Sequence, residues 1–211
     1  DRYNEGERFS NDIDLLVKPD GLDKVEKALR NLGYVQGKYN AENNTVIPYT
    51  RLEIVKRRMN RGEAAPFIKL TGFTEIPFIE VDINFSLGNT PSEELELLAE
   101  MVDSGREYSG KVSIRVPSAE LFFLHLIMHQ YKESCLYFMA VRSKDLDLYK
   151  LADIYYIVQS GVIDINKVFA LAEQYKIKDK LGAVLQQIGE IFSDEDILSF
   201  SEQLGAKQPD I

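Results

Sequence analysis

Residues 11–17 read Asn-Asp-Ile-Asp-Leu-Leu-Val, a short apolar run that carries two carboxylates, Asp12 and Asp14, near its start. Residues 18–21, Lys-Pro-Asp-Gly, are typical of a turn, so the run predicts a β-strand that ends there. Successive side chains of a strand point to opposite faces of its sheet. Asp12 and Asp14 are therefore expected to share one face, while Ile13 is expected to point into the core.

Helical and extended patterns then alternate along the N-terminal half. Residues 22–32 carry apolar side chains at helical spacing, and Gly33 follows where a C-cap is expected. From residue 34 to residue 89, β-branched and aromatic runs separated by Gly and Pro predict several antiparallel strands. The predicted strands cover residues 45–47, 52–55, 67–70 and 78–83, and a helix at 91–108 and a last strand at 112–116 follow.

From Ser118 onward the apolar residues recur almost entirely at helical spacing. Ser118 and Glu120 form a capping signal for a helix through Met128. Further apolar helix faces cover residues 146–158, 168–172 and 181–191. The sequence therefore predicts an α+β fold in two domains: residues 1–116 form a lobe with a mixed or antiparallel sheet and flanking helices, and residues 117–211 form an all-α lobe.

Composition narrows the classes of function. The 211 residues contain 25 Lys and Arg against 34 Asp and Glu, and this net charge of -9 disfavours sequence-independent binding to a nucleic-acid backbone. No apolar run reaches the roughly 18 residues of a transmembrane helix, so no membrane partner is expected. The single cysteine, Cys135, excludes an internal disulfide framework, fits a reducing compartment, and is expected to be a small buried residue. A cytoplasmic location is predicted.

A second pair of carboxylates, Glu80 and Asp82, alternates with apolar residues on a later predicted strand. Carboxylates that lie close together resist ionising together, and the usual compensation is a divalent cation. Hard oxygen ligands favour magnesium. For either pair alone, a polar outer face of the sheet is an equal interpretation, and Glu80 could instead pair with a basic residue of segment 56–61.

Residues 8–17, Arg-Phe-Ser-Asn-Asp-Ile-Asp-Leu-Leu-Val, and the helix after them resemble the nucleotidyltransferases of the DNA polymerase beta-like superfamily. More narrowly, they resemble a bacterial branch of mostly uncharacterised nucleotidyltransferases. The likeness extends more loosely to residues 79–83, to the helix with His125 and His129, and to residues 148–154.

This resemblance implies magnesium-dependent transfer of a nucleoside monophosphate from a nucleoside triphosphate (NTP), with pyrophosphate as the leaving group. Asp12 and Asp14 would bind two magnesium ions that carry the triphosphate. Asp82 would bind the ion that activates the acceptor oxygen, and Glu80 is a fourth available metal ligand. Two ions can stabilise the attacking and leaving oxygens of an in-line displacement, so no covalent protein nucleophile is required.

The superfamily's Gly-Ser element, which holds the triphosphate, is not found upstream of Asp12. We expect it in residues before Asp1, because the chain begins without Met. Otherwise Arg8 and Ser10 bind the phosphates, for which the Arg8 fork is suited, or the activity is lost. By the resemblance, the helix with Lys150 faces the cleft, so Lys150 or Lys144 is expected to contact phosphate.

Other polar and aromatic groups have two interpretations each. The basic residues between 51 and 61 face the triphosphate or an anionic acceptor, or they form a solvated hairpin. His125 and His129 share a helix face, and a hydrogen-bonding role is favoured over a zinc pair because no third ligand is marked. A tyrosine cluster is expected in the core and lobe interface rather than on a nucleobase: Tyr149, Tyr155 and Tyr156.

The acceptor is not specified by these motifs. A small molecule is favoured because the net charge disfavours RNA, although tRNA and protein acceptors are compatible with the superfamily. An alternative hypothesis is a non-catalytic nucleotide-binding or regulatory module that retains the fold. A third hypothesis, a zinc hydrolase built on His125 and His129, is the least favoured.

Overall fold

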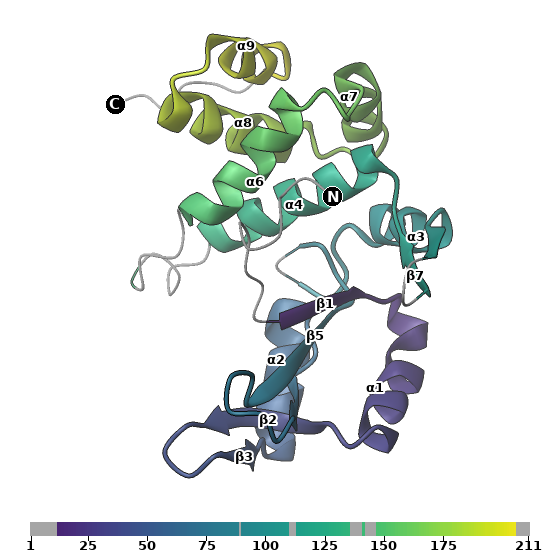
Figure 1. Cartoon of the computed structure of the whole chain (residues 1–211). Helices are drawn as coiled ribbons and strands as arrows, with labels where there is room; N and C mark the ends of the chain where they lie inside the picture. Colours follow the sequence, from purple (N-terminus) through teal and green to yellow (C-terminus); the bar gives the residue numbers. More distant parts are fainter. Residues whose placement is uncertain (1–11, 89, 110–112, 136–140, 142–146, 206–211) are drawn as a thin grey trace. The chain divides into compact units, whose positions relative to one another are not determined.

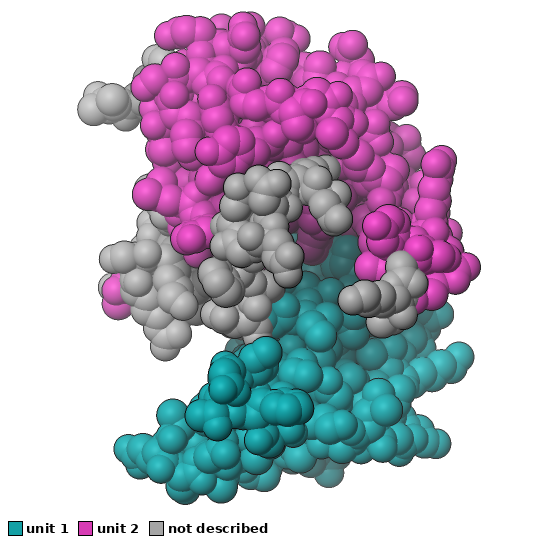
Figure 2. Space-filling model, in the orientation of Figure 1, with its two compact units in different colours: residues 1–98 teal, residues 99–211 magenta. Residues whose placement is uncertain are grey.

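The computed structural model describes residues 12–88, 90–109, 113–135, 141 and 147–205 (Figure 1). The chain divides into two compact units, residues 1–98 and residues 99–211, which Figure 2 distinguishes by colour. The predicted α+β fold is confirmed. The predicted domain limits stay a prediction, since compactness alone does not define where a domain ends.

A five-stranded mixed sheet in the order β1-β5-β4-β2-β3 forms the framework of unit 1. The edge strand β1 runs parallel to β5, and the other neighbouring strands are antiparallel. The predicted strand runs at 45–47, 67–70 and 78–83 are confirmed. The strands are β1 (Asp12–Leu16), β2 (Val35–Asn40), β3 (Thr45–Pro48), β4 (Phe67–Leu70) and β5 (Phe78–Asn84).

The core of unit 1 lies between one face of this sheet and α1 (Leu22–Asn31), which follows the 3-10 turn η1 (Pro19–Gly21). Leu22 and Leu29 of the helix pack with strand residues such as Val81 and Ile83. Ile13 was expected in this core, but 49% of its surface is exposed. It lies near the start of an edge strand, and the packing on the core begins two residues later, at Leu15.

Residues 52–55 are not a strand, so that prediction was wrong. They belong to α2 (Arg51–Arg61), which begins with a capping box. The Glu53 amide donates to Thr50 Oγ1 over 3.3 Å, and the Thr50 amide donates to the Glu53 carboxylate over 2.7 Å. This box satisfies two backbone donors, and the Arg, Lys and Met residues that follow favour a helix. The basic segment is therefore helical rather than a hairpin.

A buried carboxylate links α2 to α1. Glu26 has only 2% of its surface exposed, and it forms ion pairs with Arg30 of its own helix and Arg58 of α2. Two guanidinium groups compensate the cost of burying this charge. Removal of either arginine would leave the buried Glu26 charge only partly compensated. The ion pair with Arg58 therefore holds α2 against α1.

The predicted helix at residues 91–108 ends earlier than expected. It forms α3 (Leu95–Asp103), and the chain then enters β6 (Arg106–Ser109), which pairs antiparallel with β7 (Ser113–Val116). Gly105 lies at the break, and the Arg115 guanidinium donates to the carbonyl oxygens of Asp103 and Gly105. The predicted last strand is confirmed in its described residues, 113–116.

Helices make up the described part of unit 2 after β7. Ser118 caps the first of them, as predicted, by accepting from the Leu121 amide over 3.3 Å. α4 packs against α6, α7 and α8, and α9 packs on α8. Every helix in the described residues is too short or too polar to cross a bilayer. The helices are α4 (Ala119–Ser134), α6 (Leu148–Gln159), α7 (Ile165–Gln174), α8 (Lys178–Phe192) and α9 (Glu195–Gln203), of which α9 was not predicted.

Two side-chain predictions for this unit need correction. Cys135 is exposed, because it lies at the C-cap of α4, beyond the turns that pack in the core. Tyr155 is a packing residue as expected, since its ring stacks on Phe192 at 4.4 Å between centroids. Tyr149 and Tyr156, in contrast, are exposed.

Gly62 provides a test of the connection between α2 and the sheet. Its φ of 62° is left-handed, and a Cβ there would overlap Cβ of Ser86. We predict that Gly62→Ala lowers the free energy of unfolding, measured by urea denaturation, by about 2–3 kcal/mol. Gly72→Ala is the matched control, because Gly72 has a φ of 80° but no atom within 4 Å of such a Cβ. That variant should lose only about 1 kcal/mol, and equal losses would contradict the overlap.

Candidate functional site

The parallel pairing of β1 with β5 brings the four predicted carboxylates to one face of the sheet. Asp12 lies opposite Glu80, and Asp14 lies opposite Asp82. Directly opposed residues point to the same face, and adjacent strands are about 4.8 Å apart. We call these four residues the carboxylate face. The opposite face of β5 carries the apolar side chains that pack on α1.

The electrostatics of this face are those of crowded like charges. Burial, followed by the charges of Glu80, Asp14 and Asp12, raises the pKa of Asp82 to about 7. Burial and the charge of Asp12 also raise the pKa of Glu80, while the charge of Arg57 lowers it. This charge effect is not an ion pair, so the alternative pairing of Glu80 with a basic residue of segment 56–61 stays a prediction.

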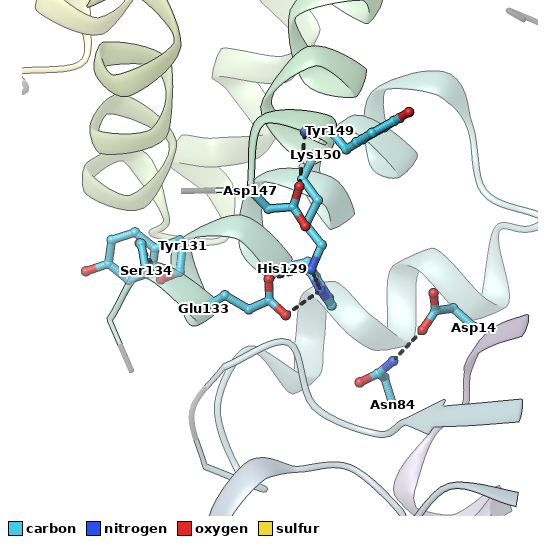
Figure 3. Close-up of polar contacts among 9 residues, drawn as sticks. All are labelled: Asp14, Asn84, His129, Tyr131, Glu133, Ser134, Asp147, Tyr149 and Lys150. Atoms are coloured by element: carbon cyan, nitrogen blue, oxygen red, sulfur yellow. Dashed lines mark hydrogen bonds and ion pairs between the residues drawn. The ribbon is translucent and has the colours of Figure 1, made fainter. Parts of the chain in front are cut away.

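Two further residues belong to this site and were not predicted. Asn84 continues the alternation on β5 after Asp82, has 7% of its surface exposed, and donates from Nδ2 to Asp14 Oδ1 over 3.4 Å (Figure 3). Glu63 forms an isolated β-bridge with Asn84, and its charge also raises the pKa of Asp82. The alternation on β5 could have indicated Asn84, whereas no sequence pattern connects Glu63 to the site.

The side chains as they lie do not form a finished metal site. In the described part of the chain, no group of three or more His, Cys, Asp and Glu side chains is arranged to hold a metal ion. The carboxylate face instead concentrates negative charge on two adjacent strands.

A polar cluster in unit 2 links α4 to α6 (Figure 3). Lys150 Nζ lies 3.0 Å from His129 Nε2 and forms an ion pair with Glu133, whose Oε1 is 3.2 Å from the same His129 atom. Burial alone would raise the pKa of Glu133, but hydrogen bonds and charge from His129 and Lys150 outweigh it and lower the pKa to about 2. The hydrogen-bonding interpretation of His129 is thus confirmed.

The other histidine has a different environment. Burial, then the positive charges of His129 and Lys132, lowers the pKa of His125 to about 3, so its ring is neutral at pH 7. The two imidazole centroids are 6.3 Å apart. Lys150 and Glu133 both contact His129 Nε2, so this ring nitrogen is engaged within the cluster rather than directed toward a metal shared with His125.

Three predicted phosphate contacts lie outside the described residues: Arg8, Ser10 and Lys144. The structure does describe Lys150, and it places that residue in the α4–α6 cluster. The carboxylate face belongs to unit 1, and the α4–α6 cluster belongs to unit 2.

Comparison with known proteins identifies a family. A family model described as uncharacterised nucleotidyltransferase matches residues 4–193. No curated protein and no solved structure matches the chain. The matched range includes every site residue predicted from the sequence.

The raised pKa of Asp82 predicts a pH-dependent effect of its removal. Because the native state holds this proton more tightly than the unfolded state, wild-type stability falls as pH rises from the usual Asp range through about 7. Without divalent cations, we expect the stability advantage of Asp82→Asn over wild type to grow by about 2–3 kcal/mol between about pH 5 and about pH 8.

Thermal and urea unfolding at both pH values would measure this difference. Asp20→Asn, which alters an exposed carboxyl group in η1, is the control and should show no such change with pH. A stability difference between Asp82→Asn and wild type that stays the same at both pH values would contradict the repulsion.

Proposed function

We propose a function from one premise: the chain belongs to the uncharacterised nucleotidyltransferase family, whose model matches residues 4–193. Membership indicates a transferase that uses an NTP. For this chain we infer the finer reaction, magnesium-dependent transfer of a nucleoside monophosphate from the NTP to an acceptor. The observation that supports it is the parallel register that sets Asp12 and Asp14 opposite Glu80 and Asp82.

The chemistry of the donor set fits magnesium. The face offers hard carboxylate oxygens from adjacent strands, and burial with like charges raises the pKa of Asp82, which is the condition that a divalent cation relieves. Asp12, Asp14 and Asp82 would hold the metal, with Glu80 as the fourth candidate. When bound, magnesium would stabilise charge on the attacking and leaving oxygens at the α-phosphorus.

The neighbouring residues of the chain would orient these ligands and the substrate. Asn84 donates to Asp14 and cannot ionise, so it fixes one carboxylate oxygen without adding charge. In unit 2, Glu133 and His129 hold the Lys150 ammonium group and the Glu133 carboxylate compensates its charge, so the proposed contact of Lys150 with phosphate rests on the resemblance. The proposed contacts of Arg8 and Ser10 rest on the resemblance alone.

A small molecule is the favoured acceptor, because a chain with a net charge of -9 attracts RNA poorly. The acceptor must supply an oxygen or similar nucleophile that attacks the α-phosphorus as the bond to pyrophosphate breaks. Candidate acceptors are therefore tested as pools of small molecules first, and as tRNA and protein fractions second.

Removal of the paired aspartates tests the proposed reaction. We expect Asp12→Asn combined with Asp14→Asn to reduce pyrophosphate release from NTPs, with magnesium and an acceptor pool, by at least about 100-fold. The matched control is Asp20→Asn combined with Asp23→Asn, which removes two exposed carboxylates of η1 and α1 and should leave the rate unchanged. Wild-type protein that binds NTP with magnesium but transfers nothing would instead support the non-catalytic module.

Asn84 provides a separate test of how the face is organised. We predict that Asn84→Ala lowers kcat by about tenfold and raises the magnesium concentration needed for half-maximal activity, because Asp14 loses its orienting donor. Asn84→Asp keeps the shape but lacks the donor, so it should not restore activity. Asn60→Ala, at an exposed position on α2, is the control. Wild-type magnesium dependence in Asn84→Asp would show that the donor has no positioning role.

A further inference from the structure

The side of the sheet that carries the carboxylates becomes apolar one strand beyond β5. Asp12 on β1 lies opposite Glu80 on β5. On the other side of β5, Glu80 lies opposite Ile68 of β4, which lies opposite Val35 of β2. Directly opposed residues point to the same face, so these four side chains form one row across the sheet. The row changes from carboxylates to aliphatic side chains within one strand spacing of about 4.8 Å.

A cavity in unit 1 begins at the aliphatic end of this row. Its volume is about 480 Å³, and we call it the hairpin cavity because β2 and β3 supply part of its wall. Its aliphatic lining consists of Val35, Val46, Ile68 and Leu70. Ile68 is buried, whereas 40% of Val35 and 38% of Leu70 are exposed, so the cavity is accessible from solvent at these two residues.

The hairpin of β2 and β3 is held against the same side of the sheet as the carboxylates. Tyr39 of β2 stacks on Phe78 of β5, with 4.3 Å between the ring centroids. Phe78 lies two residues before Glu80 on β5, so the two side chains share a face. Val46 of β3, which lines the cavity, lies opposite Tyr39 in the hairpin. The hairpin cavity is therefore continuous with the carboxylate face.

Two polar residues of the lining are engaged elsewhere. Thr45 Oγ1 donates to Asn43 Oδ1. Lys69 lies opposite Ile79, which packs on the core, and its ammonium group lies 5.7 Å from the centroid of the Tyr34 ring. The cavity therefore presents mainly aliphatic surface. Such surface binds apolar groups, whereas the polar edges of a nucleobase would lose water there without gaining hydrogen-bond partners.

We propose that the hairpin cavity binds an apolar group of the acceptor, so that the acceptor is a small molecule with a hydrophobic part and a hydroxyl group. Ile68 and Asp82 are diagonal neighbours across β4 and β5, about 7–8 Å apart. An acceptor whose hydroxyl lies about this far from its apolar group spans from the cavity to the carboxylate that is proposed to hold the activating ion.

The transfer step assigns each part of such an acceptor a role. Its hydroxyl oxygen forms a bond to the α-phosphorus and releases its proton, while the bond to pyrophosphate breaks. Burial of the apolar group supplies binding energy that positions this oxygen. The inference rests on the proposed function for the role of the acceptor, whereas binding of an apolar group does not require transfer.

Unbranched primary alcohols from butanol to octanol are the probes that test the proposal. Each is titrated into the full chain, and binding is followed by NMR of the methyl groups. We expect the dissociation constant to fall about threefold to fourfold for each added CH₂ group, as for a buried methylene. The methyl signals of Val35 and Leu70 should shift on binding. An affinity that does not rise with chain length overturns the proposal.

Polar substitutions in the cavity provide the second measurement. Val35→Thr combined with Leu70→Gln should weaken octanol binding by about tenfold or more. The matched control is Val55→Thr combined with Leu52→Gln, which makes the same changes at exposed positions of α2 and should bind as wild type does. Circular dichroism checks the fold, and Val35→Thr against Val55→Thr, at 40% and 41% exposure, replaces the pair if a double variant is unfolded. Equal affinities of variant and control overturn the proposal.

Competition with a non-hydrolysable ATP analogue and magnesium separates the acceptor from the nucleotide. Simultaneous binding of octanol and the analogue supports the acceptor assignment, whereas displacement of octanol means that the cavity binds the nucleobase and overturns it. Octanol binding that depends on Val35, without pyrophosphate release with any acceptor, would support the apolar site while contradicting the proposed transfer. Transfer at the wild-type rate in the Val35 and Leu70 double variant would contradict this inference and leave the proposed function standing.

Discussion

The pairing of β1 with β5 in parallel register is the constraint on which the site depends. Burial of Val81 and Ile83 against α1 sets which face of β5 is apolar. A slip of one residue would turn that apolar face away from the core, so packing fixes the register strongly. The same register forces Asp12, Asp14 and the β5 carboxylates together. The hydrophobic core therefore offsets the electrostatic repulsion on the opposite face.

The two units use carboxylates in opposite ways. Glu133 receives hydrogen bonds and positive charge from His129 and Lys150, and its pKa is lowered. Asp82 is partly buried among other acids, and its pKa is raised. The first arrangement stabilises the contact between two helices, whereas the second holds charge in an unfavourable state that a cation can relieve. Such local cost is expected at sites shaped for function rather than for stability.

Sequence patterns predicted the parts of the fold that depend on local spacing. The alternation at Asp12 and Asp14 and again at Glu80 and Asp82 was enough to predict two carboxylate pairs, because a strand fixes which side chains share a face. The parallel alignment of those strands depends on tertiary packing, and Glu63 reaches the site only through a bridge to Asn84. No local pattern encodes a contact of that kind.

The error at residues 52–55 shows how local signals compete. Three apolar residues, Leu52, Ile54 and Val55, indicated a strand, but the capping box between Thr50 and Glu53 starts a helix that the next basic residues continue. The exposed Cys135 has a similar explanation. Burial was predicted for it from its residue type alone, whereas its position at the end of α4, where the chain leaves the core, exposes it.

The misassigned helix also fixes where two later contacts form, the ion pair of Arg58 with Glu26 and the bridge of Glu63 to Asn84. Adjacent residues of a helix are about 100° apart around its axis, so Arg57 and Arg58 can both face inward and still meet different partners. At its end, Gly62 turns the chain in a left-handed conformation that lets Glu63 pair with Asn84. A hairpin with the same composition would not combine these placements. The helical state of α2 therefore determines which arginine meets the buried Glu26 and which extra carboxylate lies beside β5.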